Sequence, residues 1–281
     1  MAASAVLTEF QGQPAVALQA PDGARATVLL HGAHVVSWIP AGGTEQLYLS
    51  PTTRHGAGTA VRGGVPVIFP QFAARGSGPR HGIARTRAWT LDGAVVRGAH
   101  AQAVLQLASD DATRAAWPHD FLAELTVAVS GAQLDIELAV TNTGSAPFQF
   151  AAALHTYLAT PDARKLQLEG LQAVGYEDGN TGEHHQQWGD VVTVIGEIDR
   201  LYHGVQRPLV LREHGRRVTI QQSQFADAVV WNPGPEKCSA LTDMPADDWT
   251  RMLCVEAAQV VDPVELQPGD EWAGMQTLIA G

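Results

Sequence analysis

Arginines are concentrated in one stretch of an acidic chain. Between residues 46 and 91 the sequence has no aspartate or glutamate, although the formal net charge of the whole chain is −11. The stretch contains six arginines: Arg54, Arg62, Arg75, Arg80, Arg85 and Arg87. Guanidinium groups match the oxygens of phosphates and carboxylates in a fork geometry. The stretch therefore predicts a site for a small anion, and a solvated loop with surface arginines is the alternative interpretation.

Two residues whose side chains can exchange protons lie in apolar segments far downstream. His155 follows the apolar run 151–154, where a histidine is more often a hydrogen-bonded core group than a functional one. Glu256 follows the run 252–255 and precedes Ala257. A carboxylate in such a strand is rarely buried without a partner or a pocket. Together the two side chains are candidates for general acid and general base.

The overall composition limits the classes of protein to which the chain can belong. The chain has 281 residues, of which 45% are hydrophobic and 17% charged, so one large core can form without disulfides. Cys238 and Cys254 form no CxxC pair. No signal peptide and no run of about 18 apolar residues is visible, so we expect a cytoplasmic protein that does not enter membranes. The acidic pI of about 5.4 argues against a nucleic-acid partner.

Strand patterns dominate, and no long helical periodicity is present. Residues 122–144 alternate between apolar and polar around Ser130-Gly131, which predicts a hairpin with one wet face. Residues 26–40 predict two strands around Gly32, and residues 110–117 a single helical turn. Short strands without βαβ alternation indicate an all-β antiparallel sandwich. With no linker composition or repeat, residues 1–281 are expected to form a single domain, with a monomer as the default state.

Several common cofactor and metal motifs are missing. The sequence contains no GxxxxGK[ST], GxSxG or HExxH pattern. His31 and His34 are three residues apart, and His184 and His185 are adjacent. On a strand, such spacings point side chains to opposite faces, so no shared metal ion is expected. No cofactor and no metal are predicted.

Six short motifs occur in an order that identifies a family. They are RGGVPVIFPQF from Arg62, PRHGIAR, LHTY, IDRLY, VVWNP and DMPADDWTRMLCVE ending at Glu256. In these the chain resembles the D-hexose-6-phosphate mutarotases (glucose-6-phosphate 1-epimerases) of the galactose-mutarotase-like, aldose 1-epimerase group. The resemblance implies an antiparallel β-supersandwich. It also implies cofactor-free interconversion of the α and β anomers of a small-molecule substrate, a hexose 6-phosphate such as glucose 6-phosphate.

The resemblance also assigns roles to individual residues. His155 of LHTY and Glu256 of CVE match the family's catalytic pair. Arg62 of RGG and Arg85 of HGIAR match substrate-binding arginines, and Asp199 of IDRLY matches an aspartate that contacts the sugar. We expect Glu256 to act as base toward the C1 hydroxyl and His155 as acid toward the ring oxygen, from either side of the sugar. A carboxylate near His155 is expected to raise the pKa of the imidazole.

Other motif positions are expected near the pocket, and some of them depart from the family pattern. His81 is expected to line the pocket. Arg80 stands where the family often has a glutamine that contacts substrate, so it either adds a third phosphate ligand or points outward. Ala73 and Gly234 replace the more usual glycine and aromatic residue at the pocket rim. Trp231 is either core packing or an aromatic face for the sugar.

Alternative interpretations concern both residues and function. Asp199 could pair with Arg200 or Arg207 instead of a sugar, and the aspartates 243, 247 and 248 are expected in a solvated turn. One rival function is an aldose 1-epimerase for free sugars, which usually has asparagine where this chain has Leu154. A second is a sugar-phosphate-binding protein without catalysis. A glycoside hydrolase that uses Glu256 with Asp199 is the weakest, because it leaves His155 unexplained.

Overall fold

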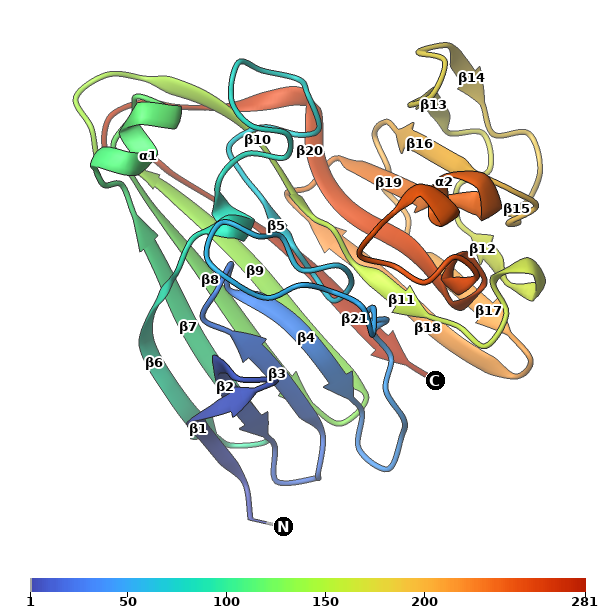
Figure 1. Ribbon diagram of the computed structural model, residues 1–281, viewed down its shortest axis with the longest axis horizontal. Helices are drawn as coiled ribbons and strands as arrows, with labels where there is room; N and C mark the ends of the chain where they lie inside the picture. Colours follow the sequence, from blue (N-terminus) through green and yellow to red (C-terminus); the bar gives the residue numbers. More distant parts are fainter. Residues whose placement is uncertain (1) are drawn as a thin grey trace.

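Antiparallel strands arranged in three sheets make up most of the computed structural model, which describes residues 2–281. In Figure 1 the strands β1 to β4 lie in front of β6 to β9, and contacts between β1 or β2 and β7 join these two layers. This confirms the predicted all-β antiparallel architecture. Within residues 2–281, no helix is long and apolar enough to span a membrane.

The first sheet contains four strands in chain order. They are β1 (Ser4–Phe10), β2 (Gln13–Gln19), β3 (Arg25–Leu29) and β4 (His34–Ile39). The predicted pair of strands around Gly32 is thus confirmed as β3 and β4. They pair antiparallel with a register shift after Thr27.

The second sheet contains most of the strands in which the six family motifs lie. Its order is β14-β13-β16-β19-β20-β10-β5, and β11 also pairs with β20. The bounds are β5 (Val67–Ile68), β10 (Phe148–Leu154), β11 (Tyr157–Ala159), β13 (Gly175–Asp178), β14 (His184–Gln186), β16 (Ile198–Tyr202), β19 (Asp227–Asn232) and β20 (Met252–Leu266).

The third sheet has nine strands in the order β15-β12-β17-β18-β21-β9-β8-β7-β6. The bounds are β6 (Thr90–Arg97), β7 (His100–Ala108), β8 (Phe121–Ser130), β9 (Gln133–Asn142), β12 (Gln167–Glu169), β15 (Val191–Val192), β17 (Leu209–Glu213), β18 (Arg216–Ser223) and β21 (Glu271–Ala280). The helices are α1 (Asp111–Ala116) and α2 (Gly234–Ala240), with 3₁₀ turns η1 (Ala84–Thr86), η2 (Ala163–Lys165) and η3 (Asp248–Arg251). α1 confirms the predicted helical turn.

The hairpin of β8 and β9 shows why the alternating pattern forms a sheet with one wet face. Leu125 pairs with Leu138 and Val127 with Ile136, and these side chains are fully buried. The residues between them in β8 and β9 are only partly buried. The turn residues are Gly131 and Ala132, one position beyond the predicted Ser130-Gly131, and Gly131 has φ +55°. Burial of one face of the sheet therefore follows directly from the period of two.

Strand β20 separates two environments. Leu253, Val255 and Ala257 belong to the large core cluster, whereas Cys254 packs in a smaller cluster on the other face. Successive side chains of a strand point to opposite faces. Glu256 therefore shares its face with Cys254 and is kept off the large core.

The segment before β5 contains two glycines held close to neighbouring backbone. Gly63 and Gly64 adopt φ of +108° and +61°. A Cβ on Gly64 would lie 2.2 Å from the carbonyl oxygen of Val35 and 2.8 Å from Nε2 of His34. Nε2 of His34 is 2.7 Å from the carbonyl oxygen of Gly63 and donates to it. These contacts fix the backbone next to Arg62.

Substitution of Gly64 should test this close approach. We expect Gly64→Ala to lower the free energy of unfolding by at least about 2 kcal/mol more than Gly42→Ala. Gly42 has a similar φ of +67° but has nothing within 4 Å of its Cβ position, so it measures the backbone strain alone. Urea unfolding of both variants gives the comparison, and equal losses would show that the contact with Val35 is unimportant.

His34 makes the stability of the fold depend on pH. Burial lowers the pKa of His34 from 6.5 to about 3, against the opposing hydrogen bond to Gly63. As the pH falls below about 6.5, the unfolded chain takes up a proton that the folded protein excludes, so stability is lost toward acid. The free energy of unfolding of the wild type should fall by about 2 kcal/mol more than that of His34→Gln between about pH 8 and about pH 5. Parallel pH profiles from urea unfolding would contradict the assignment.

Candidate active site

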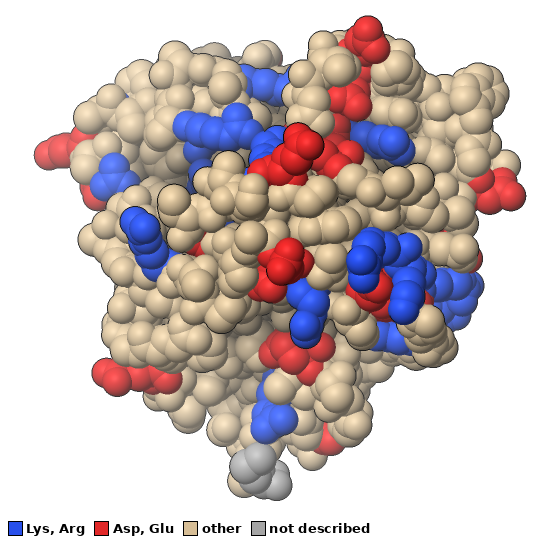
Figure 2. All heavy atoms as spheres, turned by 45° about the vertical axis from the view of Figure 1, so that its right-hand side comes forward, with Lys and Arg blue, Asp and Glu red and all other residues tan. Residues whose placement is uncertain are grey.

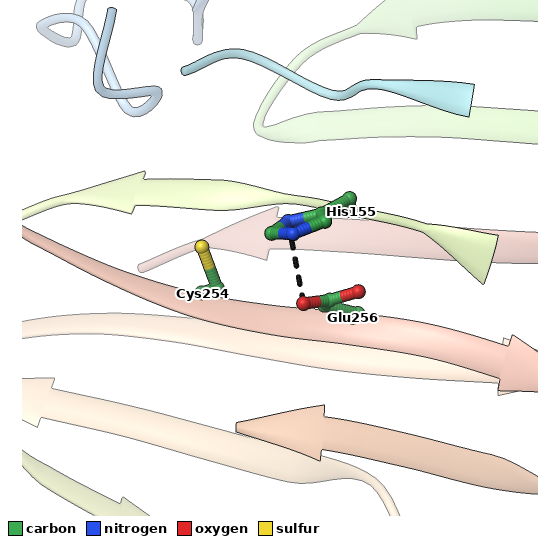
Figure 3. A group of neighbouring side chains, drawn as sticks. All are labelled: His155, Cys254 and Glu256. Atoms are coloured by element: carbon green, nitrogen blue, oxygen red, sulfur yellow. Dashed lines mark ion pairs between the residues drawn. The ribbon is translucent and has the colours of Figure 1, made fainter. Parts of the chain in front are cut away.

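His155 and Glu256 lie opposite each other across two antiparallel segments. Leu154 pairs with Ala257 and Tyr157 pairs with Cys254, and the same register places His155 opposite Glu256. Nδ1 of His155 is 3.2 Å from Oε1 of Glu256. Figure 3 shows the carboxylate beside the imidazole ring, with Cys254 on the same face of β20. The two groups are in direct contact, and the prediction that they stand on either side of a cleft is wrong in this respect.

The contact is not an aligned hydrogen bond. Nδ1 of His155 and Oε2 of Glu256 are both buried without a hydrogen-bond partner among the described residues. The residues themselves are only 8% and 1% exposed. Buried polar atoms are normally paired. Hydrogen-bonding capacity is therefore left for a ligand at this position.

Burial favours the neutral forms of both groups. It lowers the pKa of His155 well below 6.5, and the charges of His81, Arg85 and Arg62 act in the same direction. It raises the pKa of Glu256 well above 4.5, together with Asp199 and against Arg85. The expectation that the neighbouring carboxylate raises the pKa of His155 is wrong, because desolvation outweighs that attraction.

A cavity of about 920 Å³ opens over this pair. Its volume lies within the range of small-molecule sites. All seven predicted site residues line it: Arg62, Arg80, His81, Arg85, His155, Asp199 and Glu256. Residues more than 190 positions apart are thus brought to one opening, with basic groups and the His155–Glu256 pair on the same wall.

Arg62 is already held by other residues of the protein. Its Nη2 lies 3.2 Å from Oδ2 of Asp243, and its Nη1 donates to the hydroxyl of Tyr157 at 3.1 Å. Nε also donates to Asp243, at 3.2 Å. A guanidinium has five N–H groups, so Arg62 keeps capacity for a ligand in a fixed orientation.

Arg80 and Arg85 differ from Arg62 in having no acidic partner among residues 2–281. Nη2 of Arg85 donates to the carbonyl oxygen of Arg80 at 3.1 Å, and Nε of Arg85 is buried with no partner in the described chain. Arg80 is exposed and lines the cavity, so it does not simply point outward. These two charges on the cavity wall are not offset by an ion pair within the described residues.

Two further arginines of the basic stretch differ in their position relative to the cavity. Arg75 lines the cavity and forms a 2.5 Å ion pair with Glu177 of β13. Arg87 donates to the carbonyl oxygen of Ala112 and is not part of the cavity wall. Figure 2 likewise shows many basic side chains beside acidic ones rather than a uniformly positive face. Tertiary structure therefore neutralises part of the positive segment.

His81 forms part of the wall next to the reacting pair. Its ring packs edge-on against His155 with 5.6 Å between ring centroids. Burial lowers the pKa of His81 to about 3, helped by Arg85 and Arg80. Nδ1 accepts a hydrogen bond from the backbone N–H of Ala73 at 3.3 Å. The neutral ring therefore carries its hydrogen on Nε2 and can serve as a donor.

Asp199 and Trp231 both line the cavity. The alternative pairing of Asp199 is wrong: Arg200 instead donates to Gln187, and Arg207 to a backbone carbonyl. Burial raises the pKa of Asp199. Trp231 is partly buried, with its ring edge-on to His155 at 6.2 Å, so it combines packing with an exposed edge at the site.

Sequence reasoning missed several residues of the site. Tyr157 stacks on His155 with ring centroids 4.9 Å apart and planes 10° apart. Asp243 and Asp248 were expected in a solvated turn, but Asp243 pairs with Arg62, and Asp248 accepts from the hydroxyl of Tyr48 at 2.7 Å. The period of two along a strand was the available signal for Tyr157, two residues after His155. No local signal pointed to the aspartates.

Comparisons with known proteins agree with this geometry. The family model described as aldose 1-epimerase matches residues 14–278. A Cenchrus ciliaris protein named "Putative glucose-6-phosphate 1-epimerase" is 33% identical, covering 96% of this chain and 85% of the relative. An Escherichia coli K12 protein of the same name is 33% identical, covering 83% of this chain and 79% of the relative.

Solved structures show the same fold. The crystal structure of "a putative mutarotase" from Salmonella typhimurium superposes with a TM-score of 0.90 at 27% identity, covering 99% of this chain and 93% of that one. A galactose mutarotase-like protein from Clostridium acetobutylicum gives a TM-score of 0.78 at 15% identity, covering 99% and 98%. The predicted galactose-mutarotase-like fold is confirmed. The chain belongs to the aldose 1-epimerase family.

Proposed function

We propose that this enzyme interconverts the α and β anomers of a hexose 6-phosphate, with glucose 6-phosphate as the first candidate. One observation carries the proposal: the His155–Glu256 pair opens onto a cavity whose wall also holds Arg80 and Arg85 without acidic partners. The two relatives that are 33% identical over 96% and 83% of this chain are each named "Putative glucose-6-phosphate 1-epimerase". A mutarotation site needs an acid, a base and a sugar-sized space, and a phosphate needs fixed cations.

Phosphate recognition is assigned first to Arg85 and Arg80. Their charges are not offset by an ion pair in the described structure, whereas Asp243 already compensates Arg62. Nε of Arg85 is a buried donor without a partner, and burial of such a group is costly unless a ligand satisfies it. Arg62 then acts as an oriented donor, and Asp199 and His81 bind sugar hydroxyls.

The reaction moves one proton at each of two oxygens. Glu256 removes the proton of the C1 hydroxyl while His155 gives a proton to the ring oxygen, so the C1–O5 bond breaks and an aldehyde forms. Rotation about C1–C2 presents the other face of the aldehyde. On closure the two residues reverse roles and return to their starting states, so no net proton is consumed.

Burial of the pair has a consequence for this cycle. Ring opening converts carboxylate and imidazolium into carboxylic acid and neutral imidazole. Desolvation favours these neutral forms, and it lowers the pKa of His155 while raising that of Glu256. The charged pair from which opening starts is therefore the less favoured form of the free site, and both protons that move on opening are returned on closure.

Further features of the protein remain proposals. A single domain is supported by one core cluster that includes residues from Val16 to Leu278. The cytoplasmic compartment and the monomeric state stay predictions.

Removal of either reacting group should abolish most of the turnover. We expect Glu256→Gln and His155→Ala each to lower kcat by about 10²–10⁴-fold, with little change in binding. The assay follows freshly dissolved α-glucose 6-phosphate to anomeric equilibrium by NMR. Glu265→Gln, an exposed glutamate of the same strand β20, is the matched control. Unchanged kcat in Glu256→Gln, or a wild type no faster than buffer, would overturn the catalytic proposal in favour of a binding protein.

Removal of the uncompensated cations should affect the phosphorylated sugar alone. We expect Arg85→Ala to lower kcat/KM for glucose 6-phosphate by about 10- to 100-fold, because a charge-assisted hydrogen bond to the phosphate is lost. The kcat/KM for glucose should not change. Arg87→Ala serves as control because Arg87 is outside the cavity wall. Equal losses on both sugars, or no preference of the wild type for the phosphate, would favour an epimerase for free sugars.

A further inference from the structure

Cys254 adds a third metal-binding group to the reacting pair. One ligand atom each from His155, Cys254 and Glu256 lies within 4.8 Å of the other two, and all three residues are buried. Figure 3 shows the three side chains converging between β20 and the segment that carries His155. The strand geometry explains the group, because Cys254 and Glu256 are two residues apart on one face of β20.

The dimensions suit a small divalent ion. In tetrahedral zinc sites, bond lengths of about 2.0–2.3 Å place neighbouring ligand atoms about 3.3–3.8 Å apart. Nδ1 of His155 and Oε1 of Glu256 are already 3.2 Å apart. Because the three ligand atoms are up to 4.8 Å apart, the sulfur of Cys254 has to approach by up to about 1.5 Å, within reach of a change in side-chain rotation.

One observation and one charge argument point to a ligand here. Nδ1 of His155 and Oε2 of Glu256 are buried with no hydrogen-bond partner in the part of the chain that the structure describes. The ligand set also balances charge, since one thiolate and one carboxylate neutralise one divalent cation. A neutral assembly avoids most of the cost of burying charge. Thiolate with imidazole selects zinc over magnesium or calcium.

We propose that the His155–Cys254–Glu256 group binds Zn²⁺ reversibly, with a fourth position open to the cavity. On binding, the Cys254 thiol and the Glu256 carboxyl release their protons to the buffer, and bonds from zinc to the sulfur, the carboxylate oxygen and the imidazole nitrogen replace bonds to water, with no change of oxidation state. The metal then occupies the atoms assigned to proton transfer, so zinc inhibits epimerisation. Only this inhibition depends on the proposed function, and metal binding itself does not.

Cobalt provides a readout that does not depend on activity. Chelator-treated protein is titrated with Co²⁺, and a thiolate-to-cobalt charge-transfer band should appear in the near ultraviolet and disappear when Zn²⁺ is added. The matched control is Cys238→Ser, since Cys238 is also buried but its sulfur contacts the carbonyl oxygen of Pro245. Cys238→Ser should keep the band and Cys254→Ser should lose it. No band in the wild type, or an unchanged band in Cys254→Ser, would overturn the proposal.

Inhibition and affinity complete the test. Zn²⁺ should inhibit the wild type and Cys238→Ser alike, whereas Cys254→Ser should need at least about tenfold more zinc for the same fractional inhibition. If Cys254→Ser fails to fold by circular dichroism, Glu256→Gln replaces it and should bind Co²⁺ at least about tenfold more weakly. Equal zinc sensitivity of all cysteine variants would disprove the site. A protein without epimerase activity that still shows the band would reject the function and retain the metal site.

Discussion

The register of β20 against the segment that contains β10 and β11 is the constraint on which the site depends. Leu154 opposite Ala257 and Tyr157 opposite Cys254 leave His155 opposite Glu256. A shift by one residue would turn one of these side chains to the other face of the sheet. The core contacts of alternate β20 residues oppose such a shift. Packing of the large core therefore maintains the distance between the two reacting groups.

The chemistry of the site follows from the burial of His155 and Glu256. Burial shifts the pKa of His155 downward and that of Glu256 upward, so the neutral pair is favoured over the ion pair. The cavity wall supplies compensating cations, but several are themselves paired with acids from remote segments, as Arg62 is with Asp243. Arg80 and Arg85 have no acidic partner among the described residues, and they are the two arginines to which we assign the phosphate in the proposed function.

The same features explain why the proposed zinc site includes both His155 and Glu256. A strand that turns a carboxylate toward a cavity turns every second neighbour the same way, and in β20 that neighbour is Cys254. Unpaired buried acceptors are useful for proton transfer because a substrate can approach them. They are also accessible to a thiophilic cation, so catalytic competence and sensitivity to zinc have one structural origin.

The sequence by itself determined the fold class and seven residues of the cavity wall, because alternation, turn residues and motif order can be read from the chain without its fold. The hairpin of β8 and β9 and the cavity position of Arg85 followed from such signals. Only the tertiary structure decided which charges pair, as with Asp243 and Arg62, and how deeply His155 is buried. Those properties depend on contacts between residues about a hundred or more positions apart and on exclusion of water, and no local pattern encodes them.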